Sequence, residues 1–200
     1  MNHPNSDLDS DSTFSSDFNA AFEEVSSAQF PNPEPAAFRA RYEDVVWHEG
    51  THELDAESFE SVRARAQRGW GVGALIVNEG SVLLVRQDSR WYAPGGMLEF
   101  DESPEEGAIR EVREETGLTV QLDGLAAIAE QTFVNAANEE TFLFYFAMFD
   151  ALLETAVLTD DPGLSDENIS AVEWHATVPI DTYDRPLIVE LLQQQHPHWE

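Results

Sequence analysis

The stretch GMLEFDESPEEGAIREVREETGL, residues 96–118, carries the signals that decide the fold. Ser103 is a natural N-cap, Pro104 suits the first helical position, and Glu106 stands where a capping box places its acid. Gly117 ends the segment, because glycine readily adopts φ > 0 just past a last helical turn. The sequence therefore predicts a single helix, about three to four turns long, between these residues.

The predicted helix has two distinct faces. Its apolar side chains share one face and are expected to be buried: Ala108, Ile109 and Val112. Glu111, Glu114 and Glu115 are spaced i, i+3 and i+4, so they gather on another face. Three neighbouring carboxylates repel one another unless a hard divalent cation binds them, and oxygen ligands of this kind suit Mg²⁺. Such a cation would neutralise phosphate charge, orient a leaving group and acidify a bound water.

The spacing of these residues resembles the signature of the Nudix hydrolases. That signature is Gly, five residues, Glu, seven residues, then Arg-Glu-apolar-X-Glu-Glu-X-Gly-apolar, and every constrained position is met: Gly96, Glu102, Arg110, Glu111, Val112, Glu114, Glu115, Gly117 and Leu118. The resemblance implies an α/β/α sandwich with a mixed sheet. It also implies cleavage of the diphosphate linkage of a nucleoside diphosphate joined to another group, with Mg²⁺ or Mn²⁺ as cofactor.

The resemblance further implies roles for individual residues. Glu111, Glu114 and Glu115 would hold the metal, Arg110 would orient a glutamate, and the backbone carbonyl of Gly96 would be a further ligand. Glu102 would support the metal less directly.

Two features just before this stretch fit a phosphate site. Gly95 and Gly96 end a Pro-Gly-Gly turn, and glycine allows a metal or phosphate to approach the backbone closely. Arg86 follows the apolar run at residues 82–85, so it is either a phosphate contact or a surface arginine at a strand end.

The general base has several candidates. The resemblance favours Glu167, which precedes a late strand containing a tryptophan. Glu139 and Glu140 are alternatives, because they belong to a loop that could border the site. Glu114 or Glu115 could itself act through a bound water.

Composition narrows the partners. The chain has 200 residues, a net charge of −29 and ten basic residues, all of them arginine. A lysine-free acidic surface resembles proteins of salt-loving microbes, where salt screens the repulsion. It argues against duplex nucleic acid or an anionic membrane as partner. The chain contains no cysteine, so disulfides, thiolate zinc sites and a catalytic cysteine are excluded. The isopentenyl diphosphate isomerases, which share the fold of the Nudix hydrolases, need such a catalytic cysteine, so this activity is disfavoured.

The chain divides into three parts. Residues 1–35 are acidic and are predicted to be a disordered tail. Within this tail, the spacing of Phe14, Phe18 and Phe22 favours a short amphipathic helix, which could dock on the domain or form a homodimer contact. Residues 36–68 precede the domain and end in a helix at 56–68, whose arginines could touch phosphates: Arg63, Arg65 and Arg68. Residues 69–200 would form the Nudix domain. No signal peptide or long apolar run is visible, so a cytoplasmic location is expected.

Strand and helix patterns fill the third part. We expect strands near 70–77, 81–87, 119–131, 140–150 and 169–175, and a final helix at about 183–195. Strands interspersed with helices indicate a mixed sheet between helices.

Two further patterns could be functional, but each has a structural explanation that is favoured. His48–His52 reads HEGTH and matches the zinc-protease pattern, but Gly50 makes a helix unlikely, so a polar turn or edge strand is favoured. Four phenylalanines invite a base-stacking interpretation: Phe133, Phe142, Phe144 and Phe146. Three of them alternate along one predicted strand opposite Leu143 and Tyr145, so core packing in a sheet covered on both faces is favoured.

The substrate stays open. Residues 132–135 contain neither the proline of many ADP-ribose enzymes nor the tyrosine of diadenosine-polyphosphate enzymes in the resembling family. Their absence argues against both an ADP-ribose compound and a diadenosine polyphosphate, and it leaves a dNTP or a nucleotide sugar open. The alternative function is a non-catalytic nucleotide sensor on the same fold, although such proteins tend to lose acids of the signature and none is lost here.

Overall fold

The computed structural model of this chain describes residues 32–154, 169–195 and 199. Its elements in chain order are α2 (Pro35–Arg39), β1 (Val46–Leu54), α3 (Ala56–Arg65), β2 (Trp70–Asn78), β3 (Ser81–Gln87), β4 (Arg90–Tyr92), β5 (Gly95–Met97), α4 (Pro104–Thr116), β6 (Val120–Asn135), β7 (Thr141–Leu153), β8 (Ile169–His175) and α5 (Arg185–Gln195). The predicted amphipathic helix near Phe14 and the candidate base Glu167 lie outside the described residues.

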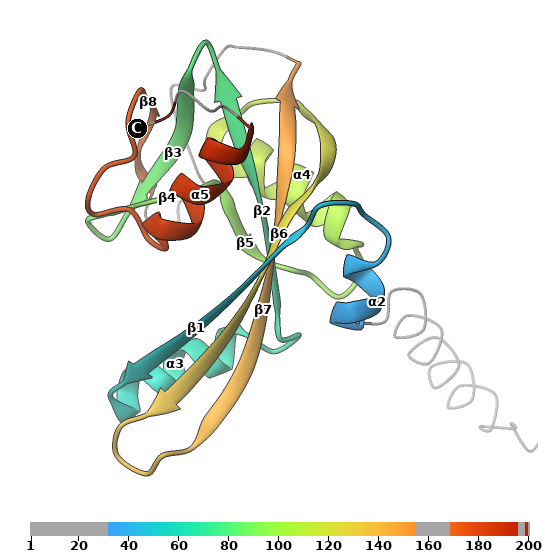
Figure 1. Cartoon of the computed structure of the whole chain (residues 1–200). Helices are drawn as coiled ribbons and strands as arrows, with labels where there is room; N and C mark the ends of the chain where they lie inside the picture. Colours follow the sequence, from blue (N-terminus) through green and yellow to red (C-terminus); the bar gives the residue numbers. More distant parts are fainter. Residues whose placement is uncertain (1–31, 155–168, 196–198, 200) are drawn as a thin grey trace, which may run out of the picture. The chain divides into compact units, whose positions relative to one another are not determined.

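The strands form one mixed sheet of eight members. Its order is β1-β6-β7-β2-β3-β4, with β5 paired to β2 and β8 paired to β3. β1 runs parallel to β6, and β2 runs parallel to β7, while the other pairs are antiparallel. β1, β6 and β7 extend together toward α3, whereas β3, β4 and β8 lie near α5 (Figure 1).

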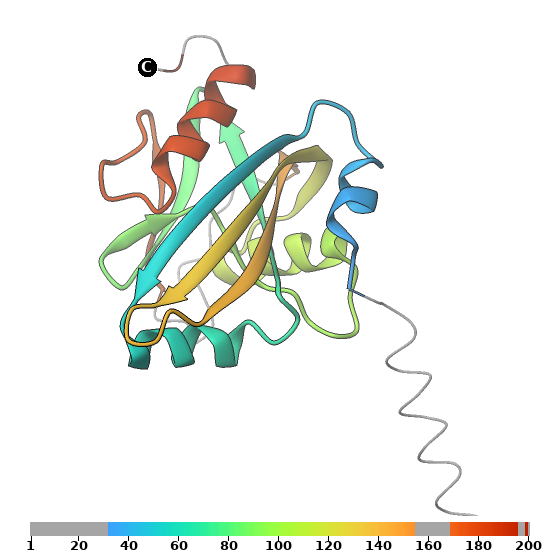
Figure 2. The same ribbon diagram turned by 60° about the horizontal axis from the view of Figure 1, so that its bottom comes forward.

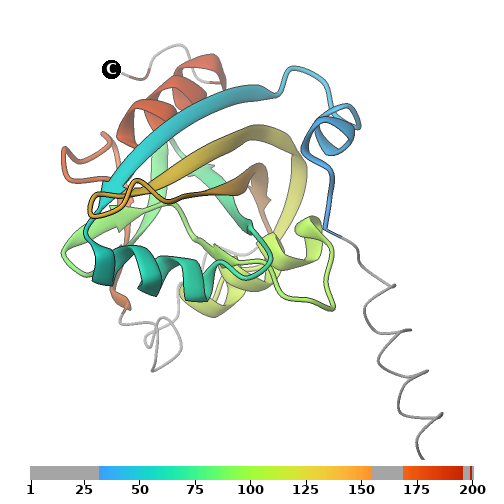
Figure 3. The ribbon, with the colours of Figure 1, turned by 90° about the horizontal axis from the view of Figure 1, so that it is seen from below.

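Helices cover both faces of this sheet. Ala108 and Val112 of α4 are fully buried, Ala108 beside Val72 and Val112 beside Ala74 and Ile76. The buried side chains of α5 pack with Leu75, which points to the opposite face of β2. α3 crosses the ends of β1, β6 and β7, which arch side by side (Figures 2 and 3). The predicted α/β/α sandwich with a mixed sheet is confirmed.

The first part of the described chain belongs to the same compact unit as the rest. Chain contacts group Asn32–Glu200 into one unit. β1 pairs along its whole length with β6, from Val46 opposite Ala127 to Leu54 opposite Asn135. Phe38 of α2 is buried against Trp70 and Phe149. The segment at 36–68, which we expected to precede the domain, therefore contributes an edge strand and core side chains to it.

Several predicted boundaries shift. The helix expected at 56–68 ends at Arg65, because the chain turns there and buries Arg68. β6 and β7 are longer than predicted, since only residues 136–140 separate them. Two burial predictions were wrong: Ile109 is 38% exposed and Leu143 is 51% exposed. Among the described residues, no helix is long and apolar enough to span a membrane.

Candidate active site

The glutamate-rich helix α4 begins and ends as its sequence predicts. The Ser103 side chain accepts a hydrogen bond from the Glu106 N–H at 3.3 Å, and the Glu106 carboxylate accepts one from the Ser103 N–H at 2.9 Å. Gly117 closes the helix with φ of 73° in the left-handed region. These two caps fix the register of the helix and therefore which of its glutamates face inward.

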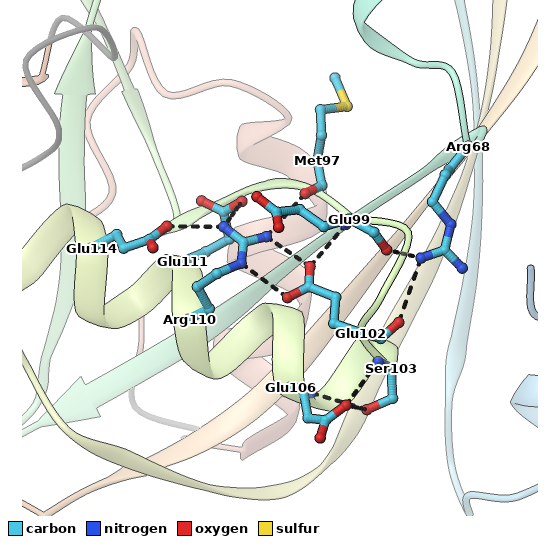
Figure 4. Close-up of polar contacts among 9 residues, drawn as sticks. All are labelled: Arg68, Met97, Glu99, Glu102, Ser103, Glu106, Arg110, Glu111 and Glu114. Atoms are coloured by element: carbon cyan, nitrogen blue, oxygen red, sulfur yellow. Dashed lines mark hydrogen bonds and ion pairs between the residues drawn. The ribbon is translucent and has the colours of Figure 1, made fainter. Parts of the chain in front are cut away.

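Arg110 is the centre of the polar network on this helix (Figure 4). Its guanidinium donates to both carboxylate oxygens of Glu102, at 2.9 and 2.7 Å. One of its terminal nitrogens also donates to Glu111 and to Glu114, each at 2.9 Å, and the other donates to the carbonyl of Met97 at 3.2 Å. A planar guanidinium suits such a fork of carboxylates. The prediction that Arg110 orients a glutamate therefore fits three acids at once.

The network sets the charge state of its members. Burial would raise the pKa of Glu102, but the hydrogen bonds from Arg110 and from the Glu99 N–H outweigh it and hold that pKa below its ordinary value. The same pairing with Glu102 raises the pKa of Arg110. Both groups are therefore charged at neutral pH, and each stabilises the ionised form of the other.

A second arginine, Arg68, supports the loop that leads into the helix. Its side chain is 6% exposed, and one of its terminal nitrogens donates to the carbonyl of Glu99 and, at 3.4 Å, to that of Glu102. It also lies over the ring of Phe100, 5.6 Å from the ring centroid. Arg68 thus holds the backbone of the loop in place, a structural use rather than the phosphate contact considered from the sequence.

Glu111 and Glu115 face the Pro-Gly-Gly turn and are each 5% exposed. The N–H of Gly95 donates to Glu115 at 2.8 Å. A Cβ atom on Gly96 would lie 2.5 to 2.7 Å from the carboxylate atoms of Glu111, so only glycine leaves that carboxylate its position. Two buried carboxylates are thereby held beside the half-buried glycine backbone of β5, and the approach of a metal or phosphate to Gly95 and Gly96 stays a prediction.

These carboxylates lie at one end of a cavity of about 330 Å³. Most of its remaining lining comes from the sheet, from the segment leading into α5 and from α5 itself: Tyr92, Ala129, Gln131, Phe133, Phe144, Phe146, Met148, Tyr183, Asp184, Leu187 and Ile188. The exposed Arg65 of α3 also lines it and supplies a cation. The lining therefore combines the two buried carboxylates of the acidic end with aromatic and apolar side chains, the combination typical of a small-molecule site.

The aromatic part of the lining contains rings that contact one another, some stacked and some edge-to-face. Phe144 and Phe146 line the cavity and also belong to buried clusters, so core packing and cavity lining are not alternatives for these side chains. Tyr183 stacks on Tyr92, with ring centroids 5.5 Å apart. Burial first, and then the charge of Asp184, raises the pKa of Tyr183 to about 12, so its hydroxyl stays neutral and can donate a hydrogen bond.

The structure does not bring every predicted site residue to the cavity. Arg86 lies outside the lining, 3.8 Å from the carboxylate of Asp181 and 5.1 Å from the ring centroid of Trp91. Glu139 and Glu140 lie in the turn between β6 and β7, where Glu140 pairs with Arg63. The lining includes Glu111 and Glu115, whereas Glu114 points to Arg110.

A divalent cation fits the acidic end by its donor set. Within the described residues, no three Asp, Glu or His side chains are arranged to hold a metal. Glu111 and Glu115 are nonetheless two buried carboxylates beside glycine backbone, and Mg²⁺ is commonly bound by one or two carboxylates together with waters and substrate phosphates. These two residues could hold such a cation without rearrangement of the fold.

Sequence reasoning missed the residues that line the far end of the cavity, notably Gln131, Tyr183 and Asp184. Gln131 had a usable signal, because it is a polar residue at an inward position between two apolar inward residues, Ala129 and Phe133. Tyr183 and Asp184 had none, since they belong to an irregular segment before α5.

Comparison with known proteins agrees with this geometry. The family model of the NUDIX domain matches residues 67–187. A MutT-like protein of Streptomyces ambofaciens is 42% identical over 62 residues, which cover 30% of this chain and 40% of that protein. The 8-oxo-dGDP phosphatase NUDT18 of Danio rerio is 31% identical over 131 residues, which cover 62% of this chain and 38% of that protein. The chain thus matches about two fifths of the length of these relatives.

A solved structure gives the same fold. The crystal structure of a UDP-X diphosphatase aligns with a TM-score of 0.51 at 21% identity, over 92% of this chain and 96% of that one. At this identity the similarity establishes the fold alone. Since the family model covers more than half of the chain and includes the whole of α4 with its glutamates, the chain belongs to the NUDIX domain family.

Proposed function

We propose that the protein is a Mg²⁺-dependent hydrolase that cleaves the diphosphate linkage of a nucleoside diphosphate joined to another group. Its substrate would be a nucleotide sugar, an ADP-ribose compound or a (d)NTP. One observation carries the proposal: Glu111 and Glu115 are both buried in a cavity whose lining also contains aromatic and apolar side chains. A diphosphate attached to a planar ring combines an anionic part, which a cation bound by the carboxylates would hold, with a part that suits the aromatic rings.

The acidic end defines the work of each side chain. Glu111 and Glu115 would bind the cation, which when bound neutralises phosphate charge and makes a water more acidic. Arg110 holds the Glu111 carboxylate at 2.9 Å and so fixes its direction, while its bidentate pair with Glu102 fixes Arg110 itself. Arg65, exposed at the cavity, is placed to attract an anionic substrate.

The reaction is a hydrolysis in which water attacks one phosphorus and the bridging P–O bond breaks. The oxygen of the leaving group departs with the electron pair, and a carboxylate of the chain accepts a proton from the water. Glu167 and the signature acids Glu114 and Glu115 are the candidate acceptors. A Gln variant of each, assayed for the pH dependence of kcat, separates them.

Both the cavity lining and the names of the relatives support a nucleotide as substrate. The aromatic rings and the neutral Tyr183 hydroxyl suit a planar, hydrogen-bonding group. The relatives include proteins whose names refer to MutT and to 8-oxo-dGDP, both consistent with a nucleotide substrate. With a net charge of −29, the chain would fold and work best in concentrated salt, where its self-repulsion is screened.

The test is a substrate panel. Purified protein is incubated with Mg²⁺ in multimolar KCl and in dilute buffer with dNTPs, ADP-ribose, nucleotide sugars and dinucleotides, and phosphate-containing products are followed. Turnover of one class supports hydrolysis and names the leaving group. Tight binding of one compound without turnover of any would instead support a nucleotide sensor.

A further inference from the structure

The HEGTH segment forms part of an edge strand, not of a helix. All of its residues belong to β1, which pairs with β6. His48 and His52 are four residues apart, so their Cα atoms are about 13 Å apart in an extended chain, too far to share one metal ion. Residues 48, 50 and 52 nevertheless point to one face of the strand. That face needs another explanation, and β1 lies outside the region that matches the family model.

This face of β1 contacts Gln131 in the neighbouring strand. Nε2 of His52 is hydrogen-bonded to Oε1 of Gln131. Gly50 is the register partner of Gln131, and a Cβ at that position would lie 2.4 Å from Oε1. Any other residue at position 50 would push the Gln131 amide away from His52. Gly50 and His52 therefore act together, one leaving room for the amide and the other fixing it.

The ring of His52 is itself held by its neighbours. It stacks on Phe133, with ring centroids 5.2 Å apart, and on Tyr183 at 6.0 Å, with interplanar angles of 28° and 23°. Both partners line the cavity. A ring held between two others presents its nitrogen in a fixed direction, so the hydrogen bond to Gln131 has a defined geometry.

Gln131 lines the cavity and is close to its acidic end along β6. Phe146 touches the acidic end, because a Cβ on Gly95 would lie 3.0 Å from its ring, and Phe146 pairs with Ala129. Gln131 is the next inward residue after Ala129, about 7 Å further along β6. It is 5% exposed and lies among apolar side chains. A buried amide in such surroundings is costly unless both of its ends have partners.

We propose that Gln131 recognises the base of the substrate and that His52 is the positioning residue that orients it. When His52 donates from Nε2, the Gln131 oxygen is occupied and the amide NH₂ is the end that can donate into the cavity. The matching ligand group is a carbonyl or ring-nitrogen acceptor on a planar base lying among the cavity phenylalanines. The proposal rests on the proposed function in that the ligand is taken to be a nucleotide.

The test uses ligands that differ only in the base. Methylene-bridged diphosphates of adenosine, guanosine, uridine and cytidine cannot be cleaved at the bridge, and calorimetry gives their Kd values in the presence of Mg²⁺. The wild-type protein should separate the best from the worst base by about tenfold or more, the size of one well-placed hydrogen bond. Gln131→Leu should reduce that ratio to near one.

The positioning role has its own variants. His52→Phe keeps the stack but removes the nitrogen, so it should lower the same ratio, and His52→Gln, which keeps an N–H donor, should restore part of it. The double variant His52→Phe with Gln131→Leu should be no worse than Gln131→Leu alone, because the two side chains act as one unit. For a cleavable substrate, KM should rise more than kcat falls. Thr51→Val, on the opposite face of β1, is the matched control.

The outcomes separate this proposal from the function itself. Equal Kd values for all bases, no binding of any of them, or an unchanged ratio in Gln131→Leu would each overturn the assignment of Gln131. Additive losses in the double variant would overturn the positioning role of His52. Binding with base preference but without turnover of any substrate would contradict hydrolysis and leave base recognition supported. If Gln131→Leu does not fold, Gln131→Asn, whose shorter amide cannot reach His52, gives the same comparison.

Discussion

Replacing Gly96 by alanine should disable the acidic end while leaving the fold intact. The new Cβ would lie 2.5 Å from one carboxylate oxygen of Glu111, whereas ordinary contacts begin at 3.4 Å. The carboxylate would have to retreat by about 0.9 Å, and it cannot swing freely because Arg110 holds it at 2.9 Å. Displacements of about 1 Å at a reacting centre cost on the order of 10²-fold in rate, or about 2.7 kcal/mol.

The assay compares kcat/KM and thermal unfolding for Gly96→Ala and for a control, Gly124→Ala. Gly124 has no atom within 4 Å of its would-be Cβ, and neither glycine has a positive φ. Both variants should therefore unfold within about 4 °C of the wild-type Tm. Only Gly96→Ala should lose activity. A folded Gly96→Ala protein with wild-type kcat/KM would show that the position of the Glu111 carboxylate does not matter for the reaction.

Three further changes test other parts of the account. Glu102→Gln should flatten the acid side of a plot of Tm against pH. The folded-state pKa of Glu102 is lowered, so its contribution to stability is present above the unfolded-state pKa and is lost as pH falls through the folded-state pKa. An unchanged plot would refute this. Ser103→Ala removes half of the capping box and should lower the free energy of unfolding by about 1 kcal/mol, measured in urea, whereas no change would mean that the cap is dispensable. Deleting residues 1–30 should leave kcat/KM nearly unchanged, because the acidic signature and the cavity lie within the later residues, and a collapse of activity would assign the tail to the site or to a dimer contact.

The glutamate helix could be predicted in detail because its signals are local. Ser103, Pro104, Glu106 and Gly117 act within one turn of each helix end, and all of them take the predicted roles. The burial of Ile109 could not be predicted in the same way. Helical spacing shows which side chains share a face, but how wide a face is covered depends on the neighbouring strands.

For the segment 48–52 of β1, the sequence left a polar turn and an edge strand as alternatives, because its pattern is mixed. Three of the nine residues of β1 are apolar, and its inward positions carry His48, Gly50 and His52. Those residues take their meaning from Gln131, which is 79 positions from His52 in the chain. Pairings of this kind come from sheet register, so the acidic signature could be predicted from sequence while the contact between His52 and Gln131 could not.

In the proposed reaction, Glu115, buried beside Gly95, is required for hydrolysis of the diphosphate linkage. The most direct measurement is kcat/KM with Mg²⁺ for Glu115→Gln, beside Glu60→Gln, an exposed acid of α3 outside the cavity lining. We expect Glu115→Gln to lose at least ~10²-fold with an unchanged Tm, and the control to keep wild-type activity. A folded Glu115→Gln protein that turns over substrate at the wild-type rate would contradict the account.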